Sequence, residues 1–253
     1  MKQAYWDRVA ENYENELFDV LSNDKKQLIA KHIRRYGKGK KLAVDLGCGS
    51  GRFLPLLSRT LQEVVAIDLS SNCLRLATQA NQRLDNVTYH KADLATKGLD
   101  IRKTDLALSV ASIMMPDIAL RNRVYDNITR QLKRGAHFIL VVPSMESAMF
   151  THSRLIEWNL KQGSSPRRAS RDRFEGHTKD DVLRHREGVA RVDGIPTKHY
   201  LREELIVLLE KRKMRILEIE KLEYDWNTEF ARPPRWMQAP GPWDWLVVSQ
   251  RTG

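Results

Sequence analysis

Short apolar runs recur along the first half of the chain, and segments with helical periodicity separate them. The runs cover residues 42–46, 64–67, 106–110 and 138–142, and a further short strand is predicted at 87–90. Their apolar residues are consecutive rather than alternating, which is typical of strands buried on both faces of a parallel sheet. Helical spacing is found at 52–61, 70–84 and 118–132. The alternation of strand and helix predicts an α/β doubly wound fold.

This alternation stops after Pro143, and residues 144–200 contain no clear strand. A connection of that length inside a compact domain is typical of a segment that covers a site. It includes Arg167, Arg168, Arg171 and Arg173 beside the turn-forming residues 163–166, which predicts a mobile Arg-rich loop. Beyond it, the pattern predicts a helix at 201–211 and strands at 214–223 and 245–248. Trp and Pro gather in this last part, as Trp226, Trp236, Trp243, Trp245, Pro233, Pro234, Pro240 and Pro242.

The length of 253 residues is large for one compact domain and small for two. We therefore expect one domain made of four parts. Residues 1–41 form an N-terminal helical cap, 42–143 the core, 144–200 an insertion over the substrate site, and 201–253 a closing helix and strands with a Trp/Pro-rich tail. With 42% apolar and 30% charged residues, the chain falls outside the collagen-like, low-complexity and disordered classes.

The net charge of +11 is concentrated in one segment, because residues 25–41 carry eight Lys or Arg and no acid. Leu28, Ile29 and Ile33 recur there at helical spacing, which predicts an amphipathic helix ending near Gly37 and Gly39. Its basic side is either a solvated face or an anion-binding face. The charge favours nucleic acid, an anionic substrate or an acidic membrane surface as a partner.

Cys48 and Cys73 are the only two cysteines, too few for a disulfide framework or a cysteine-only zinc site. A reducing, cytoplasmic setting fits them best, and neither a signal peptide nor a membrane span is visible. No His/Cys cluster has the spacing of metal ligands, and Asp105 and Asp117 alone do not make a carboxylate cluster that would hold a metal ion. We expect no metal.

A glycine-rich turn stands where the first predicted strand meets the first helix, with the sequence Asp45-Leu46-Gly47-Cys48-Gly49-Ser50-Gly51. Glycines let the backbone adopt positive φ and approach a ligand, and the helix N-terminus offers free amide donors. Arg52 occupies the position where a nicotinamide fingerprint has its third glycine, and no Gly-Lys-Ser/Thr follows. Neither dinucleotide binding nor a P-loop therefore fits the turn.

Three acidic residues stand at the carboxyl ends of successive predicted strands: Asp45, Asp68 and Asp93. Ligands of open α/β sheets bind just outside the carboxyl ends of the strands, where these side chains are expected. One carboxylate there can accept both ribose hydroxyl hydrogens, and a second can accept from an adenine amino group. A third, near the glycine turn, can balance an ammonium group.

These motifs together resemble the class I S-adenosylmethionine-dependent methyltransferases. The matching segments are 45–51, Ile67-Asp68-Leu69-Ser70, Ala92-Asp93-Leu94, the fourth strand 105–110 and the turn and fifth strand 132–140. The resemblance implies a Rossmann-like seven-stranded sheet, mostly parallel with an antiparallel last strand and helices on both faces, and S-adenosyl-L-methionine as cofactor.

The same resemblance implies roles for individual residues. Asp68 is expected on the ribose hydroxyls, Asp93 near the adenine amine, and Leu69 and Leu94 against the ring. Asp45 and the turn residues Gly47, Cys48, Gly49 and Gly51 are expected around the methionine portion, with Ser109 of the fourth strand also at the cofactor. Residues 5–13 look like the start of small-molecule members, including the quinone-biosynthesis type, where a tyrosine reaches the cofactor; Tyr13 is the candidate. Tyr5 and Trp6 either form part of a lid or fasten a helix to the sheet.

Methyl transfer from a sulfonium is an in-line displacement, and a hydroxyl or protonated-amine acceptor needs a base. His199, at the entry to the helix at 201–211, is the candidate; His152 and His177 in the insertion are weaker ones. The segment 109–113 lacks the Asn/Asp-Pro-Pro-Tyr/Phe motif of enzymes that methylate exocyclic base amines, and neither cysteine follows a proline. A small-molecule acceptor is expected. RNA, bound by the basic 25–41 stretch and the Arg-rich loop, is the alternative, and a fold relic that binds the cofactor without turnover is a third hypothesis.

Overall fold

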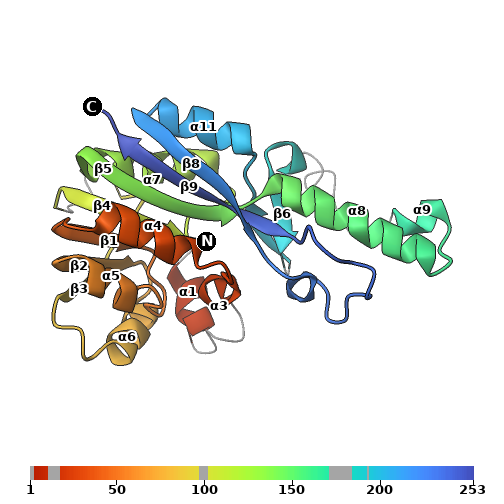
Figure 1. The fold of residues 1–253 in the computed structure, drawn as a ribbon, viewed down its shortest axis with the longest axis horizontal. Coiled ribbons are helices and arrows are strands. Elements are labelled where there is room, and N and C mark those ends of the chain that lie inside the picture. The colour runs from red at the N-terminus through yellow and green to blue at the C-terminus, as the bar shows by residue number, and fades with distance from the viewer. Residues whose placement is uncertain (1–2, 11–17, 97–101, 171–183, 193) are drawn as a thin grey trace.

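A single seven-stranded sheet forms the centre of the computed structural model, which describes residues 3–10, 18–96, 102–170, 184–192 and 194–253 (Figure 1). The strand order is β3-β2-β1-β4-β5-β9-β8. The strands are β1 (Leu42–Leu46), β2 (Glu63–Asp68), β3 (Val87–Lys91), β4 (Thr104–Val110), β5 (Leu132–Pro143), β8 (Met214–Glu223) and β9 (Trp243–Arg251). Strand β9 runs antiparallel to both of its neighbours, and every other neighbouring pair is parallel. The expected fold class is confirmed.

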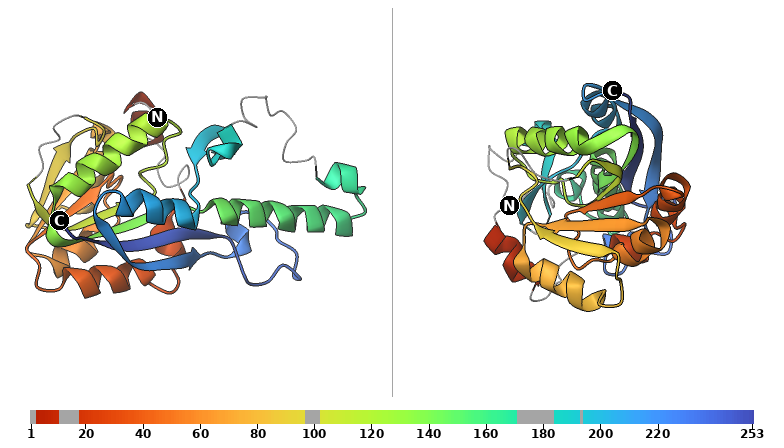
Figure 2. Two further views of the ribbon diagram at one scale, coloured as in Figure 1. Left: turned by 90° about the horizontal axis from the view of Figure 1, so that it is seen from above. Right: turned by 90° about the vertical axis from the view of Figure 1, so that its left-hand side faces the viewer.

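Helices cover both faces of this sheet (Figure 2). One face carries α4 (Leu28–Gly37), α5 (Leu54–Thr60) and α6 (Ser71–Ala80), and the other carries α7 (Ile118–Gln131) and α11 (Arg202–Glu210). All five residues of β1 are buried, because apolar helix faces lie on both sides of it. The consecutive apolar runs in the sequence have this physical origin.

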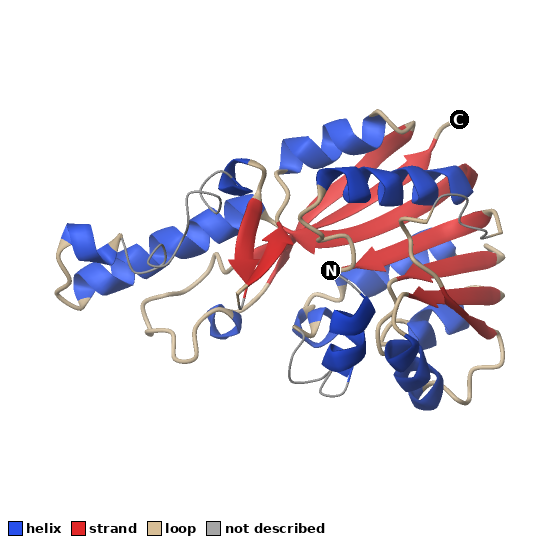
Figure 3. Ribbon diagram, turned by 180° about the vertical axis from the view of Figure 1, so that it is seen from behind, coloured by secondary structure: helices blue, strands red, loops and turns tan. Residues whose placement is uncertain are grey.

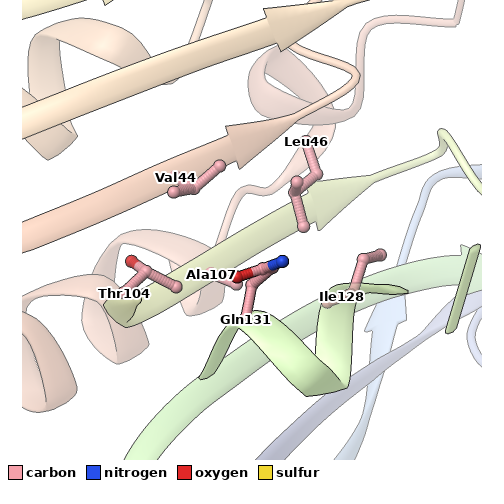
Figure 4. A pocket seen from close by; sticks show the side chains of 6 residues that line it. All are labelled: Val44, Leu46, Thr104, Ala107, Ile128 and Gln131. Carbon is pink, nitrogen blue, oxygen red and sulfur yellow. The ribbon is translucent and has the colours of Figure 1, made fainter. Parts of the chain in front are cut away.

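The sheet is well packed against α7. A cavity of ≈ 10 Å³ remains between β1, β4 and α7, and Val44, Leu46, Thr104, Ala107, Ile128 and Gln131 line it (Figure 4). That volume is about the smallest that holds one water molecule. The gap is therefore a packing feature of the core and not a ligand site.

The expectation of no strand between 144 and 200 is wrong. Strands β6 (Val189–Val192) and β7 (Ile195–Lys198) form a separate two-stranded antiparallel sheet. Each has only four residues, and Arg191 and Pro196 interrupt their apolar character, so neither produces an apolar run. The rest of the described insertion is helical, with α8 (Met145–Lys161) and α9 (Pro166–Ala169) joined at residues 163–166. Arg171 and Arg173 lie outside the described residues.

Helix α8 continues away from the sheet beyond the end of β5 and carries α9 at its far end (Figures 1 and 3). Contacts between aromatic rings join α8 to the start of β9 and to the segment between β8 and β9, which includes the short helix η2 (Trp226–Thr228). Phe150 of α8 lies 5.6 Å from Trp226 and 5.9 Å from Trp243, and Trp158 lies 5.5 Å from Phe230, measured between ring centroids. The Trp-rich tail therefore packs against the insertion.

At the N-terminus, α1 (Gln3–Val9) lies against α6, and α3 (Val20–Asn23) precedes α4. Among the described residues, no helix has both the length and the apolar character needed to cross a membrane.

Candidate functional site

The glycine turn after β1 is held against the end of β2 by backbone hydrogen bonds. The amides of Gly47 and Cys48 donate to the carbonyl oxygen of Ile67 at 2.8 and 2.9 Å. The amide of Gly49 donates to Oδ2 of Asp68 at 2.9 Å. These bonds fix the turn at the carboxyl edge of the sheet, the edge at which ligands of open α/β sheets bind.

Two of the turn glycines have no room for a side chain. Gly47 has φ +74°, and a Cβ on it would lie 2.4 Å from Cβ of Ser112. Gly51 has φ +79°, and a Cβ there would lie 2.7 Å from Nδ2 of Asn81. Both the backbone conformation and the close approach require glycine at these positions. The sequence pattern identified the glycines, and the contacts show why they are needed.

Asp45 is buried at the end of β1, and its Oδ2 has no hydrogen-bond partner among the described residues. Burial, and secondarily the charge of Asp68, raises the pKa of Asp45 to about 7. A buried carboxyl oxygen without a donor costs free energy unless a ligand supplies one. The arrangement thus fits a ligand that brings a cationic or hydrogen-bond-donating group to Asp45.

Asp68, at the end of β2, accepts hydrogen bonds on both carboxylate oxygens. In addition to Gly49, the amide of Ser70 donates to its Oδ1 at 2.8 Å. Burial raises the pKa of Asp68, and these backbone hydrogen bonds act in the opposite direction. Each carboxylate oxygen has two lone pairs, so the group still has capacity for a ligand's hydroxyls. Nearby, the hydroxyl of Ser70 donates to Asp7 of α1 at 2.6 Å, a contact that the sequence did not reveal.

The loop after β3 brings Asp93 to the same edge, because the amide of Ala92 donates to the carbonyl oxygen of Asp68 at 3.0 Å. Asp93 is exposed, and its Oδ1 accepts from the amide of Ala95 at 2.8 Å. Leu69 and Leu94 follow the two acids and are half-buried. Two carboxylates, each followed by a partly open leucine, therefore stand on adjacent loops.

Ser109 is fully buried in β4 rather than open at the edge. Its hydroxyl oxygen lies 2.6 Å from that of Ser112, which in turn donates to the carbonyl oxygen of Leu46 at 2.8 Å. Ala111, between them, has φ +50°, a conformation that costs a non-glycine residue about 1 kcal/mol or more. This strain lies between β1 and β4, where the strand order reverses and ligands of such sheets bind. The sequence pattern gave no sign of Ala111 or Ser112.

His199 is buried where β7 leads toward α11. Its Nδ1 lies 3.0 Å from the carbonyl oxygen of Thr197. The residues on either side of His199 bind to the loop after β4. The amide of Lys198 donates to the carbonyl oxygen of Met114 at 2.8 Å, and the hydroxyl of Tyr200 donates to the carbonyl oxygen of Ile113 at 2.8 Å. The β6–β7 hairpin is thereby attached to the carboxyl end of β4.

Lys198 itself is a buried cation that sequence reasoning missed. Its Nζ donates to Oε2 of Glu204 at 2.7 Å and to the carbonyl oxygen of Glu187 at 2.9 Å. Burial lowers the pKa of Lys198, and its hydrogen bond to Glu204 acts in the opposite direction. Its satisfied hydrogen bonds indicate a role in holding the hairpin.

The remaining predicted site residues lie at the N-terminus or in the insertion. Tyr5 and Trp6 of α1 are half-buried, with ring centroids 5.1 Å apart. The carbonyl oxygen of Trp6 lies 4.0 Å from Sγ of Cys73, so these aromatics stand where α1 meets α6. His152 is half-buried on α8. Tyr13 and His177 lie outside the described residues.

Half of the cations in the basic stretch 25–41 pair with acids on strand β8 or just beyond it. The four pairs are Lys25–Asp225, Lys26–Glu223, Lys31–Glu220 and Arg35–Glu218. His32, fully buried on α4, also lies 2.9 Å from Glu220. With Glu218 and Glu220 it forms a group that could hold a metal ion by proximity, but the flanking cations already occupy the carboxylates. This face of α4 serves the packing of the fold.

Comparisons with known proteins agree with this geometry. Residues 44–140 match the family model described as a methyltransferase domain. No curated protein matches the sequence significantly.

Solved structures with a similar fold include the N-methyltransferase NodS from Bradyrhizobium japonicum in complex with S-adenosyl-L-homocysteine (11% identity, 99% of this chain and 98% of that chain, TM-score 0.63). A SAM-dependent methyltransferase from Methanosarcina mazei has 22% identity over 87% of this chain and 97% of that chain, with a TM-score of 0.61. The 1,6-didemethyltoxoflavin-N1-methyltransferase of Burkholderia thailandensis, with its acceptor and S-adenosylhomocysteine bound, has 14% identity over 99% of this chain and 87% of that chain, with a TM-score of 0.63.

Proposed function

Because this chain belongs to the class I S-adenosylmethionine-dependent methyltransferase superfamily, we propose that it transfers a methyl group to a small-molecule acceptor at the carboxyl edge of its sheet. The observation that carries the proposal is the pair of carboxylates at that edge, of which Asp45 is buried and Asp68 is half-buried. Asp45 has an unpartnered oxygen, and Asp68 holds the glycine turn in place.

The residues of this edge fit S-adenosyl-L-methionine, which supplies a methyl group on a positively charged sulfonium when bound. Asp45 and the glycine turn would receive the methionine portion, whose ammonium group satisfies the orphaned oxygen. Asp68 would accept from the ribose hydroxyls and Asp93 from the adenine amine. Leu69 and Leu94 would contact the ring, and Tyr13 would complete the cofactor site.

On the acceptor side, the chain's own residues orient the acceptor and exclude water. The helix α1, the β6–β7 hairpin and the Trp-rich tail are the candidates for this enclosure. His199 is the proposed base for an acceptor that loses a proton. If its Nδ1 donates to Thr197, the proton-accepting nitrogen of the neutral ring is Nε2.

An RNA acceptor has weaker support, since it depends on the basic stretch as a phosphate-binding surface. Four cations of that stretch already pair with acids of β8 and the segment after it. NodS and the toxoflavin enzyme, whose names describe N-methyltransferases, are likewise similar over nearly the whole of this chain. These observations favour a small molecule.

Calorimetry with S-adenosylhomocysteine tests the cofactor assignment. We expect Asp68→Ala to reduce affinity at least about ten-fold, because two charge-assisted hydrogen bonds to the ribose are lost. Asp68→Asn, which retains an acceptor oxygen, is the variant to use if Asp68→Ala fails to fold. Asp85→Ala removes the same charge from an exposed position before β3 and should leave affinity unchanged. Unchanged affinity in both Asp68 variants would refute the ribose assignment.

Incubation with methyl-labelled S-adenosylmethionine tests the acceptor class. Label should enter the low-molecular-weight fraction of a cell extract, and His199→Gln should reduce its rate. Incorporation into RNA alone would overturn the small-molecule proposal and leave the cofactor assignment intact.

A further inference from the structure

We propose that a second, basic pocket binds a small phosphate-bearing anion at the edge of the sheet opposite the methyl-transfer edge. The pocket has a volume of ≈ 270 Å³. Its lining residues come from the end of α7, the turn between α11 and β8, and the end of β9, and are Asp126, Thr129, Arg130, Lys211, Arg212, Lys213 and Arg251. The fold thus brings five cations from three separate segments to one concave surface.

The arginines of the basic pocket are fixed mainly by neutral acceptors. Arg251 donates from Nη1 to the carbonyl oxygen of Arg212 at 2.6 Å. Arg130 donates from Nε to the carbonyl oxygen of Asp126 at 3.0 Å and from Nη2 to Oδ1 of Asn127 at 2.7 Å. Hydrogen bonds to neutral groups orient a guanidinium without cancelling its charge, so it is pre-organised for an anion.

Arg212 is held by two helices at once, α11 and α7. Its Nη1 donates to the carbonyl oxygen of Leu208 at 2.9 Å, and its Nη2 donates to Oδ1 of Asn122 at 3.0 Å. Its Nε pairs with Asp126 at 2.7 Å. Asp126 is the one carboxylate among the lining side chains, and this pair uses it.

The charge of the basic pocket is therefore only partly compensated, because Asp126 offsets one of its five cations. Lys211 and Lys213 are exposed, and neither ammonium group has an ion pair within the described part of the chain. The cations of α4 that face β8 are different, since each has an acid beside it. Five cations against one carboxylate in a concave surface attract a multiply charged anion, and phosphate oxygens match the donors of arginine and lysine.

The position of the basic pocket separates it from the cofactor. Strand β8 begins there at Met214 and β9 ends there at Arg251, whereas Asp45 and Asp68 stand at the opposite ends of parallel strands. Further cations precede strands along the same edge, including Lys38 and Lys41 before β1. The pocket's volume of ≈ 270 Å³ accommodates a single small phosphate-bearing anion.

Titration with inorganic phosphate and with ribose 5-phosphate, followed by amide chemical shifts, tests the site and separates free phosphate from a phosphomonoester. Lys211→Gln and Lys213→Asn each remove a cation from the pocket. Asn suits position 213, where φ is +59°, because it tolerates the left-handed conformation. Each variant should weaken binding about five-fold or more.

Lys38→Gln is the matched control, because Lys38 lies on the same edge but outside the pocket. It should leave phosphate affinity unchanged, and all three variants should bind S-adenosylhomocysteine normally. The proposed phosphate site would be refuted if Lys38→Gln weakened phosphate binding equally, or if the protein bound a 20-nucleotide RNA but neither small anion. Because cofactor binding is read separately, this outcome is distinguishable from a failure of the proposed function.

Discussion

Two groups of carboxylates in this protein have opposite surroundings. Glu218 and Glu220 on β8 face cations of α4, with Arg35 at 3.0 Å from Glu218 and Lys31 at 3.7 Å from Glu220. A hydrogen bond from Tyr36, followed by the charges of His32, Arg35 and Lys31, lowers the pKa of Glu218.

At the carboxyl edge, the buried Asp45 lies near the half-buried Asp68, and no salt bridge reaches either of them within the described residues. Burial raises the pKa of both. The first group stabilises the native fold without a ligand. The second group carries a desolvation cost that a cationic or hydroxyl-bearing ligand relieves. The difference indicates which acids serve structure and which serve binding.

The largest expected effect comes from Gly47→Ala, because this substitution disrupts the glycine turn beside Asp45 and Asp68. The added Cβ would lie 2.4 Å from Ser112, and the residue would keep φ +74°. We expect loss of S-adenosylhomocysteine binding and a decrease in the free energy of unfolding of more than about 3 kcal/mol. Calorimetry and denaturant unfolding measure the two effects.

Gly39→Ala is the matched control for this variant. Gly39 also has φ +74°, but nothing lies within 4 Å of its Cβ position. It should cost only the backbone strain of about 1 kcal/mol and leave binding intact. Equal behaviour of the two variants would show that the contact with Ser112 is unimportant.

A smaller effect is expected from pH, acting through Asp45. In the folded, ligand-free protein the pKa of Asp45 is about 7 instead of the ordinary 3.8, so its carboxyl group is mostly protonated below about pH 7. The contribution of Asp45 to the free energy of unfolding is present at low pH and is lost as the pH rises from about 4 through 7. Binding of an ammonium group requires the ionised form. Affinity for S-adenosylhomocysteine should therefore rise about ten-fold between pH 6 and 8.

Asp45→Asn should remove this dependence. The variant is expected to bind more weakly at pH 8, with an affinity that is nearly constant from pH 6 to 8. A wild-type affinity that falls over this range would contradict the assignment of Asp45 to the ammonium group.

The smallest expected effect comes from Glu220→Gln in the paired group. The glutamine side chain would keep an acceptor oxygen for His32, which lies 2.9 Å from the Glu220 carboxylate. It would lose the exposed ion pair with Lys31. Unfolding free energy should fall by about 1 kcal/mol or less, and cofactor affinity should not change. Reduced affinity would show that β8 contributes to the site after all.

Much of the core could be predicted from the sequence, because its signals are local. Strand β1 has the predicted bounds, and the helix predicted at 118–132 is α7, at Ile118–Gln131. Asp45, Asp68 and Asp93 were placed by the rule that acids after parallel strands share one edge. Hairpin β6–β7 was not predicted, because four-residue strands that pair only with each other need no run of apolar residues.

By itself, the sequence determined the α/β alternation, the glycine turn and the identity of the acids at the strand ends. These follow from side-chain size, polarity and order along the chain. Only the tertiary structure decided which charges cancel. Strand β8 lies about 190 residues from α4 along the chain, and its acids, together with Asp225 just beyond it, pair with half of the cations of the basic stretch. The five cations of the basic pocket, from α7, the turn before β8 and the end of β9, meet around a single carboxylate, Asp126. Coulomb interactions depend on distance in space, which the order of residues does not record.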